Sequence, residues 1–405
     1  MDKYKYVILG GGPAGLTFAN KLLQSGEKSF VLLEAENEAG GLCRSKMVDG
    51  APLDIGGGHF LDVRRPKVNE FLFKFMPEDE WDKYNRDSRI EINGIEVSHP
   101  IEANIWQMPI EMQVDYLKSV AVAGCNQGKE MPREFVDWIF WKLGERIAND
   151  YMIPYNKKIF SKNLNELGTY WLEKLPNVSF EETLRSCLEH KAYGTQPGHA
   201  QFYYPKKYGY GELWLRMAKD LGDNVIYNSK VNTIDFNTMT VRTDSGMEFA
   251  GEKIITTIPW KSIDNLTGMP EELHDDIKEL KHSSVQIEYH KENMDTEAHW
   301  IYYPSEELSY HRILVRHNFC PNSSGYWTET NCERAQKGDN ENSYDNEYAY
   351  PLNTINKPEI MSRLISWCEG KQVYPLGRWG EHQHYNSDVT VMRAMELYER
   401  ISRKG

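Results

Sequence analysis

The beginning of the chain shows a strand, a glycine-rich turn, a helix and a second strand. Tyr4–Leu9 is a short, mainly apolar run, which predicts a buried strand. Between residues 16 and 23 the apolar positions recur at helical spacing, and Gly26 is suited to ending this helix. Phe30–Leu33 is a second apolar run. Together these elements predict a βαβ unit, whose usual size is about thirty residues or more.

The middle of the chain predicts a hairpin and a group of helices. Ile90–Val97 alternates apolar and polar residues around Asn93-Gly94, a pair that accepts the positive φ angles of a tight hairpin turn. Residues 111–150 carry an apolar stripe at helical spacing. Residues 333–346 are polar, so we expect a loop there.

The remaining patterns alternate between helix and strand. We expect a helix after residue 211, short strands over residues 224–260, further strands between residues 285 and 316, and closing helices at Ser362–Glu369 and Val389–Ser402. Strands and helices that alternate in this way favour an α/β fold.

The length and charge of the chain exclude several classes of protein. Its 405 residues predict more than one domain, and its net charge of −13, without a long Lys/Arg run, argues against a nucleic-acid partner. No window reaches the roughly 18 apolar residues of a membrane span, and the N-terminus shows no targeting pattern, so we expect a cytoplasmic protein without a transmembrane segment. The six cysteines form no CxxC pair and the histidines have no third ligand at metal spacing, so we predict no metal site.

The turn after the first strand carries the pattern G-x-G-x-x-G at Gly10, Gly12 and Gly15. The first glycine permits a tight turn, the second lets backbone amides approach a pyrophosphate at the start of the helix, and the third allows close helix–strand packing. Glu34 ends the second strand, where a carboxylate can accept hydrogen bonds from a ribose. These residues predict a dinucleotide site, but they do not separate NAD from FAD.

Longer stretches resemble the superfamily of flavin-containing amine oxidases and UDP-galactopyranose mutases, on its mutase-like branch. They are EAENEAGGLCRSKMVDGAPLDIGGGHF after the second strand, the Pro-Tyr-Asn-x-Lys run that starts at Pro154, and PLGRWGEHQHYNSDVTVMRAMEL near the end. The resemblance implies FAD, bound without a covalent link. It places residues 40–42 around the pyrophosphate, residues 54–60 beside the flavin ring, and Val231 against the adenine.

The glycine turn and the resemblance together give a set of cofactor-binding residues. The set is Gly10, Gly12, Pro13, Ala14, Gly15, Glu34, Ala35, Gly41, Leu42, Gly57, Gly58, His59, Val231, Gly377, Arg378, Asn386 and Ser387. The last helix begins with small polar residues, which suit an anion or the hydroxyls of a ribityl chain.

The resemblance also implies catalytic positions. His59 follows three glycines, where it either tunes the flavin or only satisfies a loop carbonyl. Arg312 would hold a substrate diphosphate, and Tyr350 would orient that diphosphate. His384 stands where the family has a substrate tyrosine, and we include it as a departure from the family pattern.

A second departure concerns the diphosphate. The family's second diphosphate arginine aligns with Leu175, and Lys174 is the nearest cation. Lysine is a poorer bidentate clamp than arginine. The part of the resemblance that concerns the flavin is therefore fuller than the part that concerns a nucleotide sugar.

We therefore predict an α/β fold in which a Rossmann-type FAD-binding domain holds an inserted mixed β-sheet substrate domain and a helical lobe. The FAD-binding domain would be discontinuous and would consist of residues 1–65, 205–260 and 365–405. Residues 66–204 would form the helical lobe with the hairpin. Residues 261–364 would form part of the substrate-binding sheet domain.

The predicted function is that of an FAD-dependent flavoenzyme. The mutase-like resemblance implies a small-molecule substrate, a nucleotide-linked sugar or a related anion, in polysaccharide or cell-envelope biosynthesis, with reduced flavin as the nucleophile. The alternative is an oxidoreductase that resembles amine or protoporphyrinogen oxidases and takes a hydride from its substrate. A flavin-bound scaffold without catalysis is a third hypothesis. The substrate, the electron acceptor and the oligomeric state stay open at this point.

Overall fold

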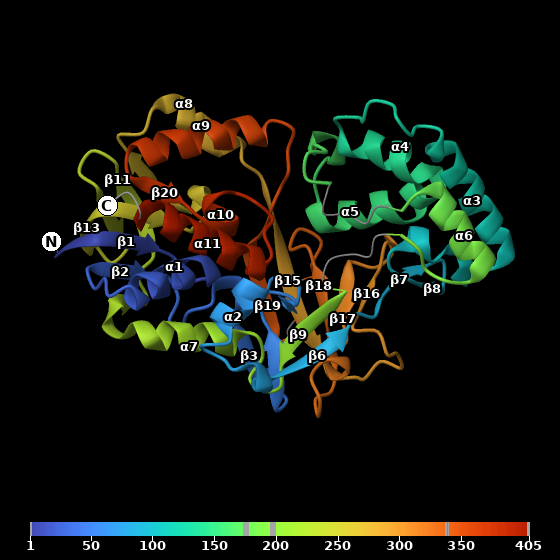
Figure 1. The fold of residues 1–405 in the computed structure, drawn as a ribbon, viewed down its shortest axis with the longest axis horizontal. Coiled ribbons are helices and arrows are strands. Elements are labelled where there is room, and N and C mark those ends of the chain that lie inside the picture. The colour runs from blue at the N-terminus through green and yellow to red at the C-terminus, as the bar shows by residue number, and fades with distance from the viewer. Residues whose placement is uncertain (1, 173–177, 195–199, 337, 339, 403–405) are drawn as a thin grey trace.

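The structure is a computed structural model that describes residues 2–172, 178–194, 200–336, 338 and 340–402. Figure 1 shows a sheet flanked by helices on one side of the molecule, a second sheet in the middle, and a group of helices beyond it. The α/β fold that the sequence predicts is confirmed. Among the described residues, no helix combines the length and the apolar character needed to cross a membrane.

The first sheet contains the predicted βαβ unit. Its strands lie in the order β10 (Val225–Ile226), β2 (Phe30–Leu33), β1 (Asp2–Leu9), β13 (Glu248–Thr256), β12 (Thr240–Thr243), β11 (Val231–Asp235) and β14 (Asn265–Thr267), and β20 (Val373–Pro375) pairs with β13. β1 runs parallel to both β2 and β13. Its side chains are buried on both faces, Ile8 in one apolar cluster and Val7 in another. Parallel strands that are covered by helices on both sides require this pattern.

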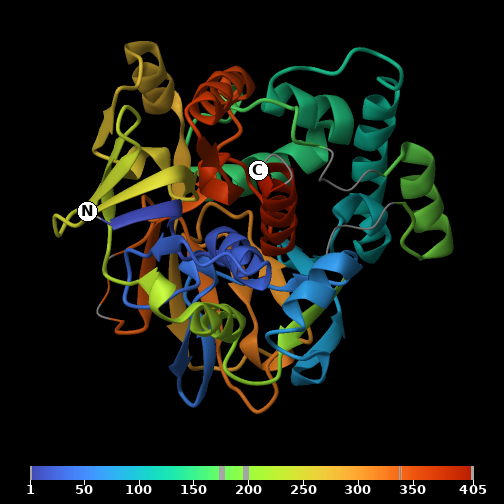
Figure 2. The same cartoon turned by 60° about the vertical axis from the view of Figure 1, so that its left-hand side comes forward.

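Helices cover the two faces of this sheet. On one face α1 (Pro13–Gln24) packs against α7 (Gly211–Leu221) and α11 (Ser387–Ser402), and Figure 2 shows the dark-red α11 beside the blue α1. On the other face α8 (Glu271–Glu279) and α9 (Lys357–Gly370) add apolar side chains to the cluster that contains Val7.

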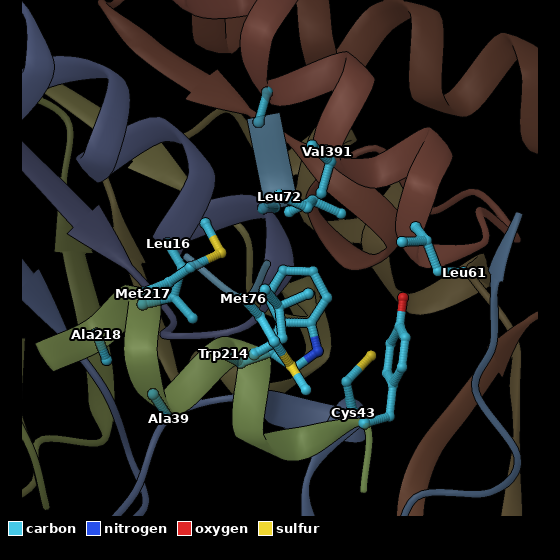
Figure 3. Close-up of a cluster of buried hydrophobic side chains, with 14 of the residues drawn as sticks. Leu16, Ala39, Cys43, Leu61, Leu72, Met76, Trp214, Met217, Ala218 and Val391 are labelled. Atoms are coloured by element: carbon cyan, nitrogen blue, oxygen red, sulfur yellow. The ribbon is translucent and has the colours of Figure 1, made fainter. Parts of the chain in front are cut away.

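The apolar cluster around α1 joins elements that lie far apart in the sequence. Leu16 from α1, Leu72 from α2 (Pro66–Leu72), Trp214 from α7 and Val391 from α11 belong to it (Figure 3). Burying a branched aliphatic side chain contributes about 1.5–3 kcal/mol. This packing fixes the position of α1 and therefore of the glycine turn that precedes it.

The second sheet contains strands from two distant parts of the chain. Their order is β19 (Ser343–Pro351), β15 (His282–His290), β18 (Tyr326–Thr330), β17 (Arg312–Leu314), β16 (Trp300–Tyr302), β7 (Ser88–Ile92) and β8 (Ile95–Ser98). The predicted hairpin is confirmed as β7–β8, with φ angles of 53° at Asn93 and 81° at Gly94. Because β7 pairs with β16, the hairpin extends this sheet.

The loop expected over residues 333–346 was wrong only at its end. Residues 343–346 begin β19, whereas the described residues among 333–342 form no helix or strand. β19 pairs with β15 and lies at the end of the strand order. An edge strand can expose one face to water, and polar residues are tolerated there.

The helical lobe lies at the far end of the second sheet (Figure 1). Its helices are α3 (Ile110–Gly124), α4 (Phe135–Ile147), α5 (Ile153–Phe160) and α6 (Phe180–Glu189). Short strands complete the fold: β3 (Ser45–Val48) pairs with β4 (Ala51–Asp54), and β9 (Gln201–Pro205) pairs with β5 (Leu61–Asp62) and β6 (Trp81–Asn85). The division into domains stays a prediction.

Candidate active site

The glycine turn between β1 and α1 has the geometry of a phosphate cradle. Gly10 has a φ of 100°, which residues with side chains rarely adopt. A methyl group on Gly15 would lie 2.0 Å from the carbonyl oxygen of Gly10, so only glycine allows this close approach of helix and strand. The nearest atom to a methyl group on Gly12 would be the Cα of Gly41, at 4.0 Å. Gly12 therefore leaves open space in front of the first N–H groups of α1.

The carboxylate of Glu34 supports the same turn. Its Oε2 accepts a hydrogen bond from the N–H of Gly11 at 2.6 Å, and its Oε1 accepts one from the N–H of Glu36 at 2.9 Å. Burial raises the pKa of this carboxyl, and the two N–H groups oppose the rise. A carboxylate oxygen can accept more than one hydrogen bond. Glu34 can therefore hold the turn and still accept from a ribose, the role that the sequence predicts.

A cavity of about 350 Å³ lies in front of the turn. The predicted residues that line it here are Gly10, Gly12, Pro13, Ala14, Glu34, Ala35, Gly41 and Leu42. Arg44, which the sequence analysis did not select, lines it too and forms an ion pair with Glu36 at 3.2 Å. Helix N–H groups, a cation and an acid at the end of β2 are the donors and acceptors that a dinucleotide requires.

Three predicted cofactor residues line neither this cavity nor the second one described below. Gly15 packs against the turn, as described above. Val231 is buried in the apolar cluster on the other face of the first sheet, so the structure does not bring it to the cavity wall. Gly377, in α10 (Gly377–Gly380), has a φ of 76°, and a methyl group there would lie 2.7 Å from the Cβ of Ala14. The C-terminal motif thus abuts the start of α1.

A second cavity, of about 430 Å³, adjoins the first. His59, Arg378 and Ser387 line both cavities. The other predicted residues that line the second cavity are Gly57, Gly58, Arg312, Tyr350, His384 and Asn386. The structure therefore brings together, in the second cavity, all of the catalytic positions that the sequence analysis selected.

The His59 ring lies where the two cavities meet. Its Nδ1 is 2.7 Å from the carbonyl oxygen of Gly57, and a carbonyl can only accept, so Nδ1 carries the proton. Burial, with the charges of Arg378 and Arg312, lowers the pKa of His59 to about 3. The imidazole is therefore neutral, and its Nε2 is an acceptor. His59 satisfies a loop carbonyl and also faces the cavities, so the two hypotheses about it are compatible.

Arg378 holds the loop that precedes α11. Its Nε and Nη2 donate to the carbonyl of Tyr385 at 3.0 and 2.8 Å, and its Nη1 donates to the carbonyl of Ala349 at 3.1 Å. Burial lowers the pKa of this guanidinium from its usual high value. Arg378 therefore fixes the backbone around the second cavity and places a positive charge at the boundary between the cavities.

The sequence analysis missed Glu329, whose fully buried side chain orients Arg312. The Nε of Arg312 donates to Oε2 of Glu329 at 2.8 Å, and the N–H of Gly58 donates to Oε1 at 3.0 Å. The Nε2 of His311 lies 3.7 Å from Oε2. One carboxylate thus connects the Gly57–Gly58 segment with Arg312, and all three of these residues line the second cavity.

Tyr350 and His384 face each other in the second cavity, with ring centroids 5.0 Å apart. Burial raises the pKa of the Tyr350 phenol, although Arg312 and Arg378 oppose the rise. Tyr350 is therefore protonated near neutral pH and can donate its O–H. Lys174 and Leu175 lie outside the described residues.

The comparison with known protein families shows to which family this chain belongs. The model of the family "Flavin containing amine oxidoreductase" matches residues 13–287. The chain belongs to this family. It is an FAD-dependent enzyme, which confirms the cofactor that the sequence predicts.

Individual proteins are also similar in sequence to parts of this chain. A coproporphyrinogen III oxidase of Mycobacterium tuberculosis is 34% identical over 74 residues, 18% of this chain and 16% of the oxidase. A UDP-galactopyranose mutase of Mycoplasma pneumoniae is 28% identical over 104 residues, 25% of each chain. The matched segments thus span a quarter or less of these relatives.

Over the whole chain, the fold is similar to the folds of solved structures. A crystal structure of reduced UDP-galactopyranose mutase superposes with a TM-score of 0.89 at 21% identity, over 100% of this chain and 95% of the mutase. A putative protoporphyrinogen oxidase from Exiguobacterium sp. 255-15 gives a TM-score of 0.71 at 14% identity, over 100% of both chains. At these identities the likeness shows the fold, which mutases and oxidases of the flavin family share.

The first cavity fits the cofactor of the family. The open space at Gly12 suits a pyrophosphate, Glu34 suits the ribose, and the boundary at His59 and Arg378 suits the flavin end. In the described residues no group of three or more His, Cys, Asp or Glu side chains is arranged to hold a metal ion.

Proposed function

We propose that this flavoenzyme acts on a nucleotide-linked sugar in a mutase-like reaction that serves polysaccharide or cell-envelope synthesis. The observation that carries the proposal is the position of Arg312. It lines the second cavity, whose wall also includes His59 and Arg378 from the flavin boundary and residues of the helical lobe, and Glu329 holds its guanidinium. An oriented guanidinium is suited to the bidentate recognition of phosphate.

The charges in the cavity support an anionic substrate. The whole chain carries a net charge of −13, yet Arg86, Arg312 and Arg378 all line this cavity. Cations gathered in a low-dielectric cleft create a local positive potential even in an acidic protein. Arg312 and Arg378 would share the charge of a diphosphate, and the Tyr350 hydroxyl would donate to one of its oxygens.

The residues at the flavin boundary have distinct tasks in this proposal. FAD, when bound, supplies the ring at which the substrate carbon reacts. The neutral His59 presents Nε2 as an acceptor, so it can accept a hydrogen bond from a substrate hydroxyl and orient that hydroxyl at the flavin boundary. The aromatic side chains of Tyr155, Trp171 and Trp300 line the same cavity and exclude water from it.

Binding and product analysis test the proposal. Dithionite-reduced and oxidised protein are titrated with UDP and UDP-galactose, and the reduced protein is incubated with the sugar nucleotide to detect a ring isomer. We expect turnover of the reduced form without net oxidation. A substrate that bleaches the oxidised flavin would favour the oxidase hypothesis, and no binding of either nucleotide would end the mutase proposal.

The variant Arg312→Ala provides the residue-level test. Loss of its charge-assisted contacts is expected to weaken UDP binding at least tenfold, about 1.4 kcal/mol. Arg242→Ala is the matched control, because Arg242 pairs with Glu248 at an exposed position of the first sheet. Equal UDP affinity in the two variants would remove Arg312 from the proposal.

A further inference from the structure

Tyr302 lies beside Arg312 in the wall of the second cavity. It ends β16 and pairs directly with Arg312 across the antiparallel strands β16 and β17. Side chains in such a pair lie on the same face of the sheet, with their Cβ atoms about 4.5–5.5 Å apart. Both residues line the cavity. A phosphate group that contacts the guanidinium of Arg312 is therefore within reach of the Tyr302 hydroxyl.

The phenol of Tyr302 is held in one orientation by its neighbours. Its ring centroid lies 5.4 Å from that of His99 and 5.3 Å from that of Tyr155. Its oxygen accepts a hydrogen bond from Nη2 of Arg86 at 3.1 Å and another from Nε1 of Trp300 at 2.9 Å. The same Nη2 of Arg86 lies 3.3 Å from Nδ1 of His99. These contacts fix the hydroxyl oxygen in the cavity wall.

The two hydrogen bonds to the oxygen decide how the Tyr302 hydroxyl can bind a ligand. A phenol has one proton to donate and two acceptor positions. The N–H groups of Arg86 and Trp300 can only donate, so they occupy both acceptor positions. Among the described residues the phenol proton has no acceptor. The O–H of Tyr302 is therefore left as a donor, which favours a ligand group that only accepts hydrogen bonds.

Arg312 presents further donors to the same cavity. Glu329 accepts from Nε and Nη2 of the guanidinium, whereas Nη1 has no hydrogen-bond partner in the part of the chain that the structure describes. The hydroxyl of Tyr350, which lines the cavity as well, is also a donor. Phosphate oxygens only accept hydrogen bonds, whereas a sugar hydroxyl both donates and accepts. The set of donors around Arg312 therefore suits a phosphate group better than a sugar.

We infer that Tyr302 is a further binding residue for the substrate diphosphate and donates its O–H to a phosphate oxygen beside Arg312. Leu175 aligns with the second diphosphate arginine of the family. A fixed neutral donor then supplies part of the binding that a second arginine would supply. The inference rests on the proposed function.

Calorimetric titration of the FAD-loaded variant Tyr302→Phe with UDP and UDP-galactose tests the inference. We expect both ligands to bind about tenfold more weakly or worse than to the wild type, because a hydrogen bond to a charged group is lost. The two losses should be equal, since the diphosphate is common to both ligands. Uridine, measured by its displacement of UDP, should bind the variant and the wild type alike.

The uridine measurement separates a phosphate contact from a structural effect. Tyr302→Phe keeps the ring but leaves the N–H groups of Arg86 and Trp300 without this acceptor. A general disturbance of the cavity would weaken uridine together with UDP. FAD affinity and urea unfolding, measured on the same variant, show whether the cofactor site and the fold are retained.

Tyr303→Phe is the matched control. Tyr303 follows Tyr302 in the chain, packs against Tyr310 with ring centroids 5.2 Å apart and does not line the cavity. This variant should keep the wild-type affinity for UDP. Unchanged UDP affinity in Tyr302→Phe, an equal loss for UDP and uridine, or a loss confined to UDP-galactose would overturn the inference and leave the proposed function intact. If the wild type binds neither UDP nor UDP-galactose, the proposed function fails and the inference fails with it.

Discussion

A methyl group at Gly12 should separate cofactor binding from folding. Gly12 has a φ of −80° and a ψ of −176°, an extended conformation that alanine adopts without strain. The nearest atom to the added methyl group, apart from neighbouring residues in the chain, would be Gly41 Cα at 4.0 Å. The free energy of unfolding of the apoprotein should therefore change by less than about 1 kcal/mol, because the loss of glycine at the N-cap and the gain from a stiffer unfolded chain offset each other.

The same methyl group would occupy the space that the pyrophosphate needs. Losing one charge-assisted contact between a phosphate and a backbone N–H costs about 1.5–3 kcal/mol, which weakens FAD binding roughly ten- to a hundredfold. The assay is titration of apoprotein with FAD by flavin fluorescence, beside urea unfolding of the apoprotein. Wild-type FAD affinity in Gly12→Ala would refute the assignment of this turn to the pyrophosphate.

Two further glycine variants serve as comparisons, one expected to destabilise the fold and one expected to be neutral. Gly15→Ala places a methyl group 2.0 Å from the carbonyl oxygen of Gly10, so helix and strand must move apart. We expect a loss of about 1–3 kcal/mol in the stability of the apoprotein as well as weaker FAD binding. A methyl group at Gly370, at the end of α9, meets nothing within 4 Å, so Gly370→Ala should change neither quantity by much. If Gly12→Ala destabilises the apoprotein as strongly as Gly15→Ala, the steric reasoning is wrong.

The remaining predictions concern buried carboxyls. Burial raises the pKa of Asp54 to about 7 against an ordinary value of 3.8. Below pH 3.8 the carboxyl is protonated in both the folded and the unfolded chain, and its contribution to the free energy of unfolding is full. As the pH rises to about 7 the unfolded chain loses this proton more readily, so the free energy of unfolding falls by about 4 kcal/mol. The variant Asp54→Asn should flatten that part of the stability curve measured by urea unfolding, and an unchanged slope would contradict the assignment. Glu329→Gln offers an amide NH₂ where Arg312 or Gly58 needs an acceptor, so we expect a loss of about 2–3 kcal/mol in the free energy of unfolding. In the double variant Glu329→Gln with Arg312→Ala, the loss of stability should be smaller than the sum of the losses in the two single variants. Additive losses would show that the two side chains are not coupled.

The parts of the site that the sequence predicts are those built from neighbouring residues. The Gly10–Gly15 turn, the acid at Glu34 and the Asn93-Gly94 hairpin each depend on local backbone geometry, which residue type controls directly. Resemblance to a family supplied Arg312 and Tyr350. Both line the cavity beside the flavin boundary.

The parts that the sequence did not reveal depend on register between strands. Glu329 lies opposite Arg312, on a neighbouring strand, and their contact follows from the pairing of β17 with β18. Arg86 meets Tyr302 because β7 lies beside β16, far away in sequence. No local pattern specifies such pairings, because a shift of one residue would turn each of these side chains to the opposite face.

The segment around Arg378 and Ser387 has a consequence for how the protein responds to its cofactor. Arg378 and Ser387 contribute to both cavities, Gly377 abuts Ala14, and α11 covers α1. The glycine turn and the segment that completes its surroundings lie far apart along the chain, so the cofactor site exists only while α11 is packed on α1. Bound FAD would therefore stabilise the packing of α11 on α1 by linkage.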